Sequence, residues 1–166
     1  GDIVTSIEPV VEEELMQVLA AVNAQYGSQE TSGIIMDPAT GEIIALGTYP
    51  TFDPNDFSGS DLSRFSNPLV ESRYEFGSIM KALTMTSGLD AGVITPESTY
   101  NDTGCMTLNS KTFCNYDLKA RGVVPMQEVL SQSLNMGAAH IAGKLGHDRF
   151  RHYLTELGLG TETGID

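Results

Sequence analysis

Residues 32–50 read SGIIMDPATGEIIALGTYP, and this stretch decides the fold class. Two apolar runs rich in β-branched residues, Gly33–Met36 and Ile43–Leu46, flank residues 37–41, whose Asp, Pro, Thr and Gly are typical of a turn. The pattern predicts an antiparallel hairpin. Residues 8–23 precede it with a proline near their start and apolar residues at helical spacing, which predicts an amphipathic helix. We therefore expect an α+β fold, with an antiparallel sheet flanked by helices.

The composition is that of a globular protein. The 166 residues suffice for one domain with a core, and 40% are hydrophobic and 19% charged. No apolar run approaches the length of a membrane span. A formal net charge of −13 would repel phosphates, so we expect no nucleic acid partner. The opening residues contain neither a basic nor an apolar signal region, so we expect no targeting segment in this chain.

The remaining segments alternate between polar and helical patterns. Residues 50–70 are rich in Pro, Ser, Asn and Asp, which predicts a long loop, and loops of this length are often functional. A second polar stretch follows around Ser98–Gly104. The tail from Pro125 to Leu157 is expected to be helical, with helices over Pro125–Gln132 and Met136–Leu145.

Two cysteines lie in CMTLNSKTFC, residues 105–114. If Asn109 and Ser110 form a two-residue turn between short strands, Cys105 pairs directly with Cys114. Cα atoms of such opposed residues lie about 4.5 Å apart, at the short end of the range that a disulfide spans. The same register also suits two reduced cysteines that face each other. An oxidising, extracytoplasmic compartment would decide for the bridge.

Lys81 is an unexpected residue for its place in a helix. Ser78 stands at the natural N-cap position, and a capping box would have Glu or Gln at position 81. A cation there meets the positive end of the helix dipole, at a cost of about 0.3–1 kcal/mol. Residues three apart share a helix face, so the amine can reach the Ser78 hydroxyl, and burial would lower the lysine pKa. The pair suits a serine nucleophile with a lysine base, although Ser-x-x-Lys also occurs by chance.

A second polar motif, Ser133-Leu134-Asn135, lies on the expected connection between two helices. In one interpretation Asn135 is an N-cap and Ser133 ends the first helix. In the other, Ser-x-Asn after Ser-x-x-Lys follows the order seen in penicillin-recognising serine acyl transferases.

Nearly the whole chain resembles the N-terminal half or so of the transpeptidase domain of class B penicillin-binding proteins, which cross-link peptidoglycan. IIMDPATGEIIALGTYPTFDPNDF, residues 34–57, resembles the family's opening hairpin and its Y-P-x-F-D-P-N segment. YEFGSIMKALTMTSGLDAGVITPESTYNDTG, residues 74–104, resembles its active-site helix. One departure is Phe76, where the family usually has proline; it touches none of the expected catalytic groups. The resemblance implies a β-lactamase/transpeptidase-like fold.

The resemblance also implies roles for four side chains. Ser78 would attack the carbonyl of the penultimate D-Ala of a stem peptide, and Lys81 would take its proton. Ser133 would pass a proton toward the leaving amine, or toward the β-lactam nitrogen of a drug. Asn135 would hydrogen-bond the substrate amide and help hold Lys81. The backbone N–H of Ser78 would form half of the oxyanion hole.

No cofactor or metal is expected. The three histidines, His140, His147 and His152, have no Cys or carboxylate at a ligand spacing, so we expect surface or packing roles for them.

The third motif of the family, Lys-Thr-Gly, does not occur in the sequence. The nearest strings are residues 111–113, which end in Phe, and residues 162–164, which begin with Glu. We therefore expect residues 1–166 to form a partial transpeptidase domain without the C-terminal part that carries the Lys-Thr-Gly strand. Alone, this chain should be inactive and should pair with a second copy through the exposed sheet edge.

The partners implied are the D-Ala-D-Ala stem peptide, β-lactams and the rest of the domain. The expected location is the extracytoplasmic face of a bacterial cytoplasmic membrane, with a membrane anchor outside these residues. Two alternatives stay open: a non-catalytic penicillin-binding sensor or interaction module, and a serine β-lactamase, which the hairpin and loop strings favour less.

Overall fold

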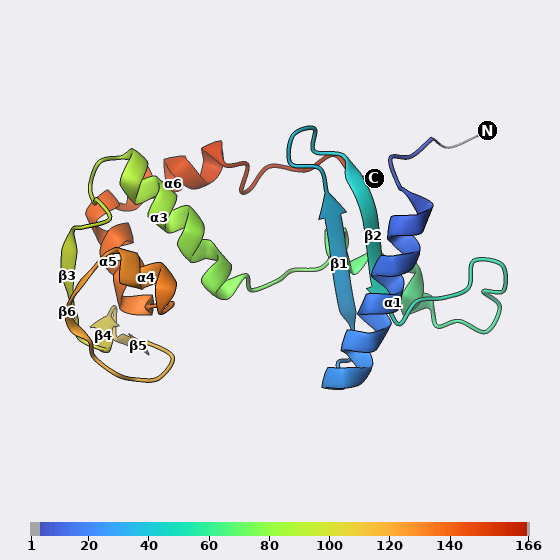
Figure 1. The fold of residues 1–166 in the computed structure, drawn as a ribbon, viewed down its shortest axis with the longest axis horizontal. Helices are drawn as coiled ribbons and strands as arrows, with labels where there is room; N and C mark the ends of the chain where they lie inside the picture. Colours follow the sequence, from blue (N-terminus) through green and yellow to red (C-terminus); the bar gives the residue numbers. More distant parts are fainter. Residues whose placement is uncertain (1–3, 166) are drawn as a thin grey trace. The chain divides into compact units, whose positions relative to one another are not determined.

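The computed structural model describes residues 4–165, which form two compact units divided between Tyr74 and Glu75 (Figure 1). Both units combine helices with two-stranded antiparallel sheets. This confirms the expected α+β class with antiparallel pairing and flanking helices. Among the described residues no helix is both long enough and apolar enough to cross a bilayer.

The N-terminal unit consists of a helix packed on a hairpin. Helix α1 spans Pro9–Tyr26, three residues beyond the expected end, and stops at Gly27, whose φ of 62° is left-handed. Strands β1 (Thr31–Met36) and β2 (Ile43–Tyr49) pair antiparallel as predicted, and both are longer than the apolar runs alone indicated. Gly47 lets α1 approach closely, because a Cβ there would collide with Met16.

The two edges of this hairpin differ. On β2, the backbone carbonyl of Ile44 accepts the Glu8 N–H at 2.9 Å, and the Leu46 N–H donates to the Glu12 carboxylate at 2.9 Å. Glu8 and Glu12 therefore satisfy part of the backbone hydrogen-bonding groups on the outer edge of β2. Strand β1 instead ends in three consecutive apolar residues that are 40–52% exposed: Ile34, Ile35 and Met36.

The loop over residues 50–70 contains two short helices, which the sequence pattern did not indicate. They are η1 (Leu62–Phe65) and α2 (Pro68–Glu71), each started by a side chain that accepts a backbone N–H. The ring of Phe52 packs edge-on against that of Phe65, with centroids 4.7 Å apart. The remainder of the segment is irregular, as expected.

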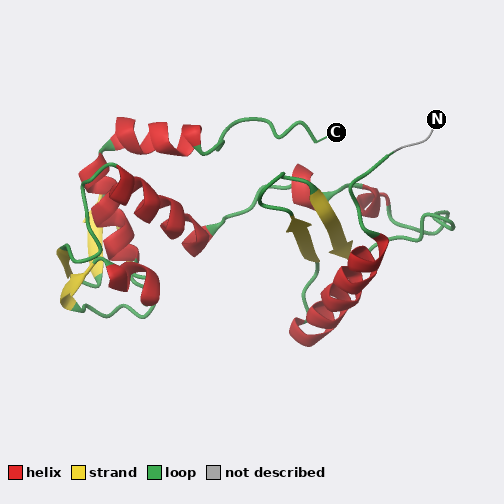
Figure 2. Cartoon of the chain, turned by 45° about the horizontal axis from the view of Figure 1, so that its top comes forward, coloured by secondary structure: helices red, strands yellow, loops and turns green. Residues whose placement is uncertain are grey.

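The C-terminal unit contains most of the helices (Figure 2). Two antiparallel pairs, β3–β6 and β4–β5, accompany four α-helices and one 3₁₀ turn. In chain order the elements are η2 (Gly77–Ile79), α3 (Met80–Asp90), β3 (Thr99–Asp102), β4 (Cys105–Leu108), β5 (Lys111–Cys114), β6 (Gly122–Pro125), α4 (Gln127–Ser131), α5 (Asn135–Leu145) and α6 (His147–Glu156).

One expectation for this unit is wrong in detail, and one strand was not predicted. The polar stretch around Ser98–Gly104 contains that strand, β3, whose alternate residues Tyr100 and Asp102 are buried. Pro125 ends strand β6 instead of starting a helix, and α4 begins only at Gln127. The expected helix-rich tail is otherwise confirmed.

A single apolar cluster forms the core of the C-terminal unit. Helices α3 and α5 pack closely at Gly88, where an added Cβ would meet Ile141 and Ile94. The buried members come from α3, the loop after it, β3, α4 with its flanking residues, and α5: Met85, Ile94, Tyr100, Met126, Val129, Leu134, Met136, Ile141 and Leu145.

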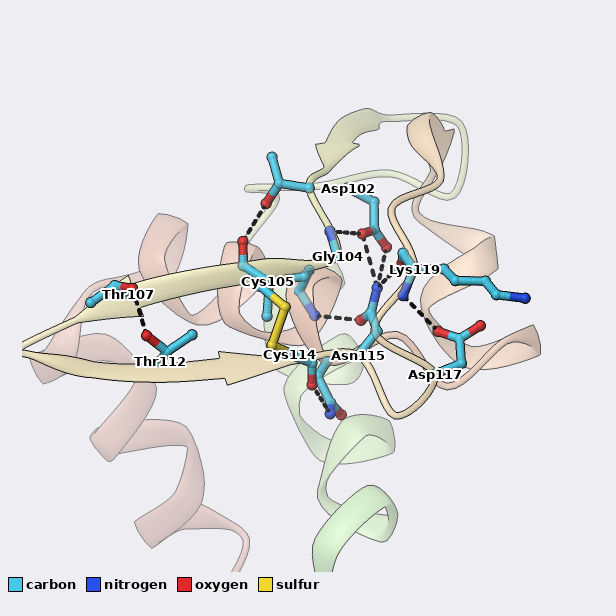
Figure 3. The surroundings of a disulfide bond; sticks show 12 residues. Asp102, Gly104, Cys105, Thr107, Thr112, Cys114, Asn115, Asp117 and Lys119 are labelled. Atoms are coloured by element: carbon cyan, nitrogen blue, oxygen red, sulfur yellow. Dashed lines mark hydrogen bonds between the residues drawn. A yellow bond between two sulfur atoms is a disulfide. The ribbon is translucent and has the colours of Figure 1, made fainter.

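The cysteine hairpin has the predicted register. Cys105 pairs with Cys114 across β4 and β5, their Cα atoms are 4.0 Å apart, and a disulfide joins them (Figure 3). Asn109 and Ser110 have φ values of 51° and 62°, as a two-residue turn of this kind requires. The bridged alternative is therefore the one that the structure contains.

Candidate active site

Ser78 and Lys81 lie at the start of α3, but Ser78 is not its N-cap. The chain enters through η2, a 3₁₀ turn whose first residue, Gly77, has a φ of 57°. Ile79 holds the cap position of α3 and makes no side-chain capping bond. The Ser78 hydroxyl is therefore free for another partner. It accepts a hydrogen bond from Lys81 Nζ at 3.0 Å, which confirms the expected contact across one helical turn.

Lys81 is buried, with 8% of its surface exposed. Its amine donates to three oxygens: Ser78 Oγ at 3.0 Å, Ser133 Oγ at 2.9 Å and the Ser133 carbonyl at 2.7 Å. No carboxylate among residues 4–165 forms an ion pair with it. Burial lowers the pKa of the Lys81 amine from its ordinary value, which is the direction that a proton acceptor needs.

Ser133 reaches this site through an uncommon backbone conformation. Helix α4 ends at Ser131, α5 begins at Asn135, and Ser133 between them has a φ of 53°. A left-handed residue that is not glycine costs free energy, so the surrounding contacts must hold it. In this conformation both its carbonyl and its hydroxyl face Lys81, and its hydroxyl donates to Ser78 Oγ at 3.1 Å.

Asn135 is placed differently from what the capping interpretation of the sequence predicted. It is the first residue of α5 and not its cap, which is Leu134. Its side-chain amide donates to the Cys114 carbonyl at 2.7 Å, and no hydrogen bond joins it to Lys81 in the described part of the chain. The expectation that Asn135 holds Lys81 is therefore wrong. The carbonyl of Ser133 holds the amine instead, because the left-handed turn directs it there.

A pocket of about 410 Å³ opens over these groups, and all four predicted residues line it. Sequence reasoning missed its other wall, which follows strand β5: Asn115, Tyr116, Asp117 and Arg121, with Gln132 beside the motif. The only signal was their position directly after the second cysteine, in a string with both charge signs.

The charges on this wall neutralise each other. The two terminal guanidinium nitrogens of Arg121 donate to the Asp117 carboxylate, at 2.7 and 2.9 Å. These bonds lower the pKa of Asp117 to about 2 and raise that of Arg121. Tyr116 is 99% exposed at the rim.

The histidines have packing or surface positions, as expected. His140 stacks on Tyr100 with ring centroids 5.5 Å apart, and burial lowers its pKa. His147 and His152 are exposed on α6. Among the described residues no three His, Cys, Asp or Glu side chains gather as a metal site would require.

Another pocket, of about 400 Å³, lies within the N-terminal unit, beside α1 and β2. Residues 1–74 contain no lysine, histidine or cysteine, so this unit lacks a base for nucleophilic catalysis of the kind seen at Ser78. The Ser78–Lys81 pair and its pocket belong to the C-terminal unit.

A serine paired with a lysine three residues on, beside a Ser-x-Asn segment, defines the class of penicillin-recognising serine acyl transferases. Residues 31–166 match the family model for the penicillin binding protein transpeptidase domain, and the chain belongs to this family. The resemblance noted in the sequence is thereby confirmed.

Similar proteins agree with this assignment. A relative in Caulobacter vibrioides, named probable peptidoglycan D,D-transpeptidase FtsI, is 32% identical over 154 residues, which cover 93% of this chain and 26% of the relative. A protein of Mesostigma viride, named peptidoglycan D,D-transpeptidase FtsI homolog, is 31% identical over 140 residues, which cover 80% of this chain and 23% of the relative. The chain thus spans about a quarter of the length of these relatives.

Solved structures give the same fold. Penicillin-binding protein 3 of Mycobacterium tuberculosis, complexed with aztreonam, superposes with a TM-score of 0.86 at 25% identity, covering 96% of this chain and 36% of that chain. A peptidoglycan glycosyltransferase from Burkholderia ambifaria superposes with a TM-score of 0.83 at 24% identity and supports the fold alone.

Proposed function

We propose that this chain contributes the nucleophile and base of a serine D,D-transpeptidase that cross-links peptidoglycan and is acylated by β-lactams. One observation carries the proposal: the buried amine of Lys81 lies within 3.0 Å of the hydroxyls of both Ser78 and Ser133, at the wall of a pocket. One amine can thus serve two hydroxyls, one that must lose a proton and one that must deliver it.

In the proposed reaction, neutral Lys81 takes the proton of Ser78 as Oγ attacks the carbonyl carbon of the penultimate D-Ala. The backbone N–H of Ser78 stabilises the oxyanion that forms. The carbon–nitrogen bond then breaks, and Ser133 passes its proton to the departing amine of the terminal D-Ala and takes a proton from the Lys81 ammonium, which is thereby neutral again. An acyl-enzyme on Ser78 results. Asn135 would hydrogen-bond the substrate amide after leaving or sharing its Cys114 carbonyl.

The acyl group then moves to an amine of a second stem peptide, which restores the Ser78 hydroxyl and forms the cross-link. A β-lactam enters the same first step, but its leaving nitrogen stays tethered to the acyl group. The name of the M. tuberculosis relative, a penicillin-binding protein complexed with aztreonam, supports this part of the proposal.

We also propose that residues 1–166 form part of a transpeptidase domain whose Lys-Thr-Gly strand lies outside them. The absence of that string from the sequence and the 36% coverage of the M. tuberculosis protein support this. The disulfide between β4 and β5 supports a location in an oxidising space, on the extracytoplasmic face of the membrane.

Pairing of two copies through β1 stays a proposal for the isolated chain. The consecutive exposed residues Ile34, Ile35 and Met36 of β1 support it. The outer backbone groups of β2 are already partly hydrogen-bonded, so β1 is the edge that a second copy would use. Sedimentation equilibrium should show a dimer that Ile35→Lys converts to monomer. A monomer at all concentrations would rule this pairing out.

The decisive test of the transpeptidase proposal is acyl transfer by the full-length protein. A thioester analogue of the stem peptide should acylate Ser78, and an added D-amino acid should be joined to the acyl group in preference to water. A stable acyl-enzyme that no amine discharges would indicate a sensor. Rapid hydrolysis of β-lactams would indicate a β-lactamase.

A further inference from the structure

We propose that Asn115, oriented by the buried carboxylate of Asp102, is a positioning residue that holds the Ser133–Asn135 segment against Lys81. The inference rests on the function proposed above and adds two residues to it. Neither residue belongs to the Ser-x-x-Lys or Ser-x-Asn motif, and both lie near the cysteine hairpin (Figure 3).

Asp102 at the end of β3 is 1% exposed, and its carboxylate is bound entirely by neutral donors. Oδ1 accepts the Gly104 N–H at 2.7 Å, and Oδ2 accepts the Tyr100 hydroxyl at 3.2 Å. The side-chain amide of Asn115 donates to both oxygens at 2.9 Å. A buried carboxylate with this many donors is a fixed anchor, because any movement would leave its charge unsatisfied.

The amide of Asn115 can adopt only one orientation here. Its nitrogen faces the Asp102 carboxylate and the Lys119 carbonyl, and its oxygen accepts the backbone N–H of Met136 at 3.2 Å. A flip of the amide would bring oxygen against carboxylate and NH₂ against N–H. Asn115 is itself 2% exposed, so no water replaces these partners.

Cys114, the last residue of β5, and Asn115, directly after it, therefore hold two consecutive residues of α5. The Cys114 carbonyl accepts from Asn135, and the Asn115 side chain accepts from Met136. The Met136 N–H is in the first turn of α5, where backbone donors have no partner within the helix. Asn115 supplies that partner from another part of the chain and fixes where α5 begins.

This clamp acts on the reacting groups through Ser133. Ser133 lies two residues before α5 in a left-handed conformation, and its carbonyl and hydroxyl hold the Lys81 amine. If α5 shifts, the carbonyl of Ser133 moves with it, and the amine loses its alignment with Ser78. Misplacement of a reacting group by about 1 Å costs about 10²-fold in rate.

The test measures acylation of the full-length protein by a chromogenic β-lactam at a temperature where melting curves show every variant folded. Saturation kinetics separate the rate constant of acylation from the dissociation constant of the first complex. The variants are Asn115→Ala, Asp102→Asn and the double variant Asp102→Asn/Asn115→Ala. Thr112→Val is the matched control, because it removes the hydrogen bond between Thr107 and Thr112 in the same hairpin without touching the clamp.

We expect Asn115→Ala to lower the acylation rate constant about 10- to 100-fold, with a smaller change in the dissociation constant. Asp102→Asn keeps the shape and one acceptor, so we expect a loss of about three- to tenfold. The acylation rate constant of the double variant should be at most about twofold below that of Asn115→Ala, because the two residues act as one unit. Thr112→Val should acylate at the wild-type rate.

Three results would overturn the inference. Asn115→Ala could acylate at the wild-type rate, it could change only the dissociation constant of the first complex, or Thr112→Val could lose as much of the acylation rate constant as Asn115→Ala does. If Asn115→Ala is unfolded at the assay temperature, Asp102→Asn decides, and wild-type kinetics in that variant reject the clamp. Failure of the underlying function is distinguishable, because the wild-type protein itself would then form no acyl-enzyme on Ser78.

Discussion

Replacing Lys81 by methionine should separate catalysis from stability. Methionine keeps the length and the helix propensity of the side chain but removes the amine, which donates three hydrogen bonds of 2.7–3.0 Å. General-base catalysis contributes about 10²–10⁴ in rate. We therefore expect acylation of the full-length protein by a β-lactam to fall by about 10²–10⁴-fold in Lys81→Met.

The effect on folding should be small, because two contributions oppose each other. Each lost hydrogen bond stabilises the fold by about 0.5–1.5 kcal/mol, while removing a buried amine relieves its desolvation. We expect the free energy of unfolding to change by less than about 2 kcal/mol, which corresponds to about 4–8 °C in Tm for a domain of this size.

The assay is stopped-flow acylation from pH 6 to 9, with thermal melts of the same samples. In the wild type the rate should rise with pH, because neutral Lys81 is the base and burial places its pKa below the ordinary value of 10.5. This rising limb should vanish in Lys81→Met. Lys144→Met, an exposed lysine of α5, is the matched control and should keep it. Acylation by Lys81→Met within tenfold of the wild type would refute the assignment of the base.

Three further predictions concern stability and charge. Thiol titration of the denatured, unreduced protein should find no free thiol, and two free thiols would contradict the bridge. Reducing the disulfide should lower the free energy of unfolding by about 2–3 kcal/mol without unfolding the chain. Gly137→Ala should lower the melting temperature, because its Cβ would lie 2.7 Å from the Tyr100 hydroxyl. Gly143→Ala on the same helix has open space and should raise it; equal shifts would contradict the packing. The Asp117 carboxyl should titrate by NMR near pH 2, so that its stabilisation is present above pH 4 and lost as the pH falls through 2, and Arg121→Gln should return it toward 3.8.

The hairpins could be predicted because their signals are local. The turn residues 37–41 indicated an antiparallel pair, and the pair Asn109-Ser110 determined the register of the cysteine hairpin by counting outward. Lys81 was also detectable locally, because it contradicts the preference of a helix N-terminus for acidic or neutral residues.

The errors arose where tertiary contacts override local preference. Ser78 has an N-cap residue type, but its hydroxyl bonds to Lys81, and the chain enters α3 through a 3₁₀ turn instead. Asn135 also has a capping residue type, yet its amide is drawn to a carbonyl on the cysteine hairpin. The Cys114 carbonyl is 21 positions away from Asn135, so the neighbouring sequence does not show this partner.

The clamp of Asp102 and Asn115 could not be predicted at all. The two residues are 13 positions apart, they lie on either side of the hairpin, and neither belongs to a motif with a known mechanism. Only the folded structure shows that the amide of Asn115 reaches both the carboxylate and the first turn of α5.

The central claim, that Ser78 is the nucleophile, is tested most directly by mass spectrometry of the full-length protein after reaction with benzylpenicillin. Ring opening releases no atoms, so the adduct should add the whole mass of the drug, and it should map to the tryptic peptide of residues 74–81, which contains Ser78 as its only hydroxyl besides Tyr74. Ser78→Ala should abolish the adduct, and the nearby Ser131→Ala should retain it. An adduct that survives Ser78→Ala, or that maps to another peptide, would contradict the account.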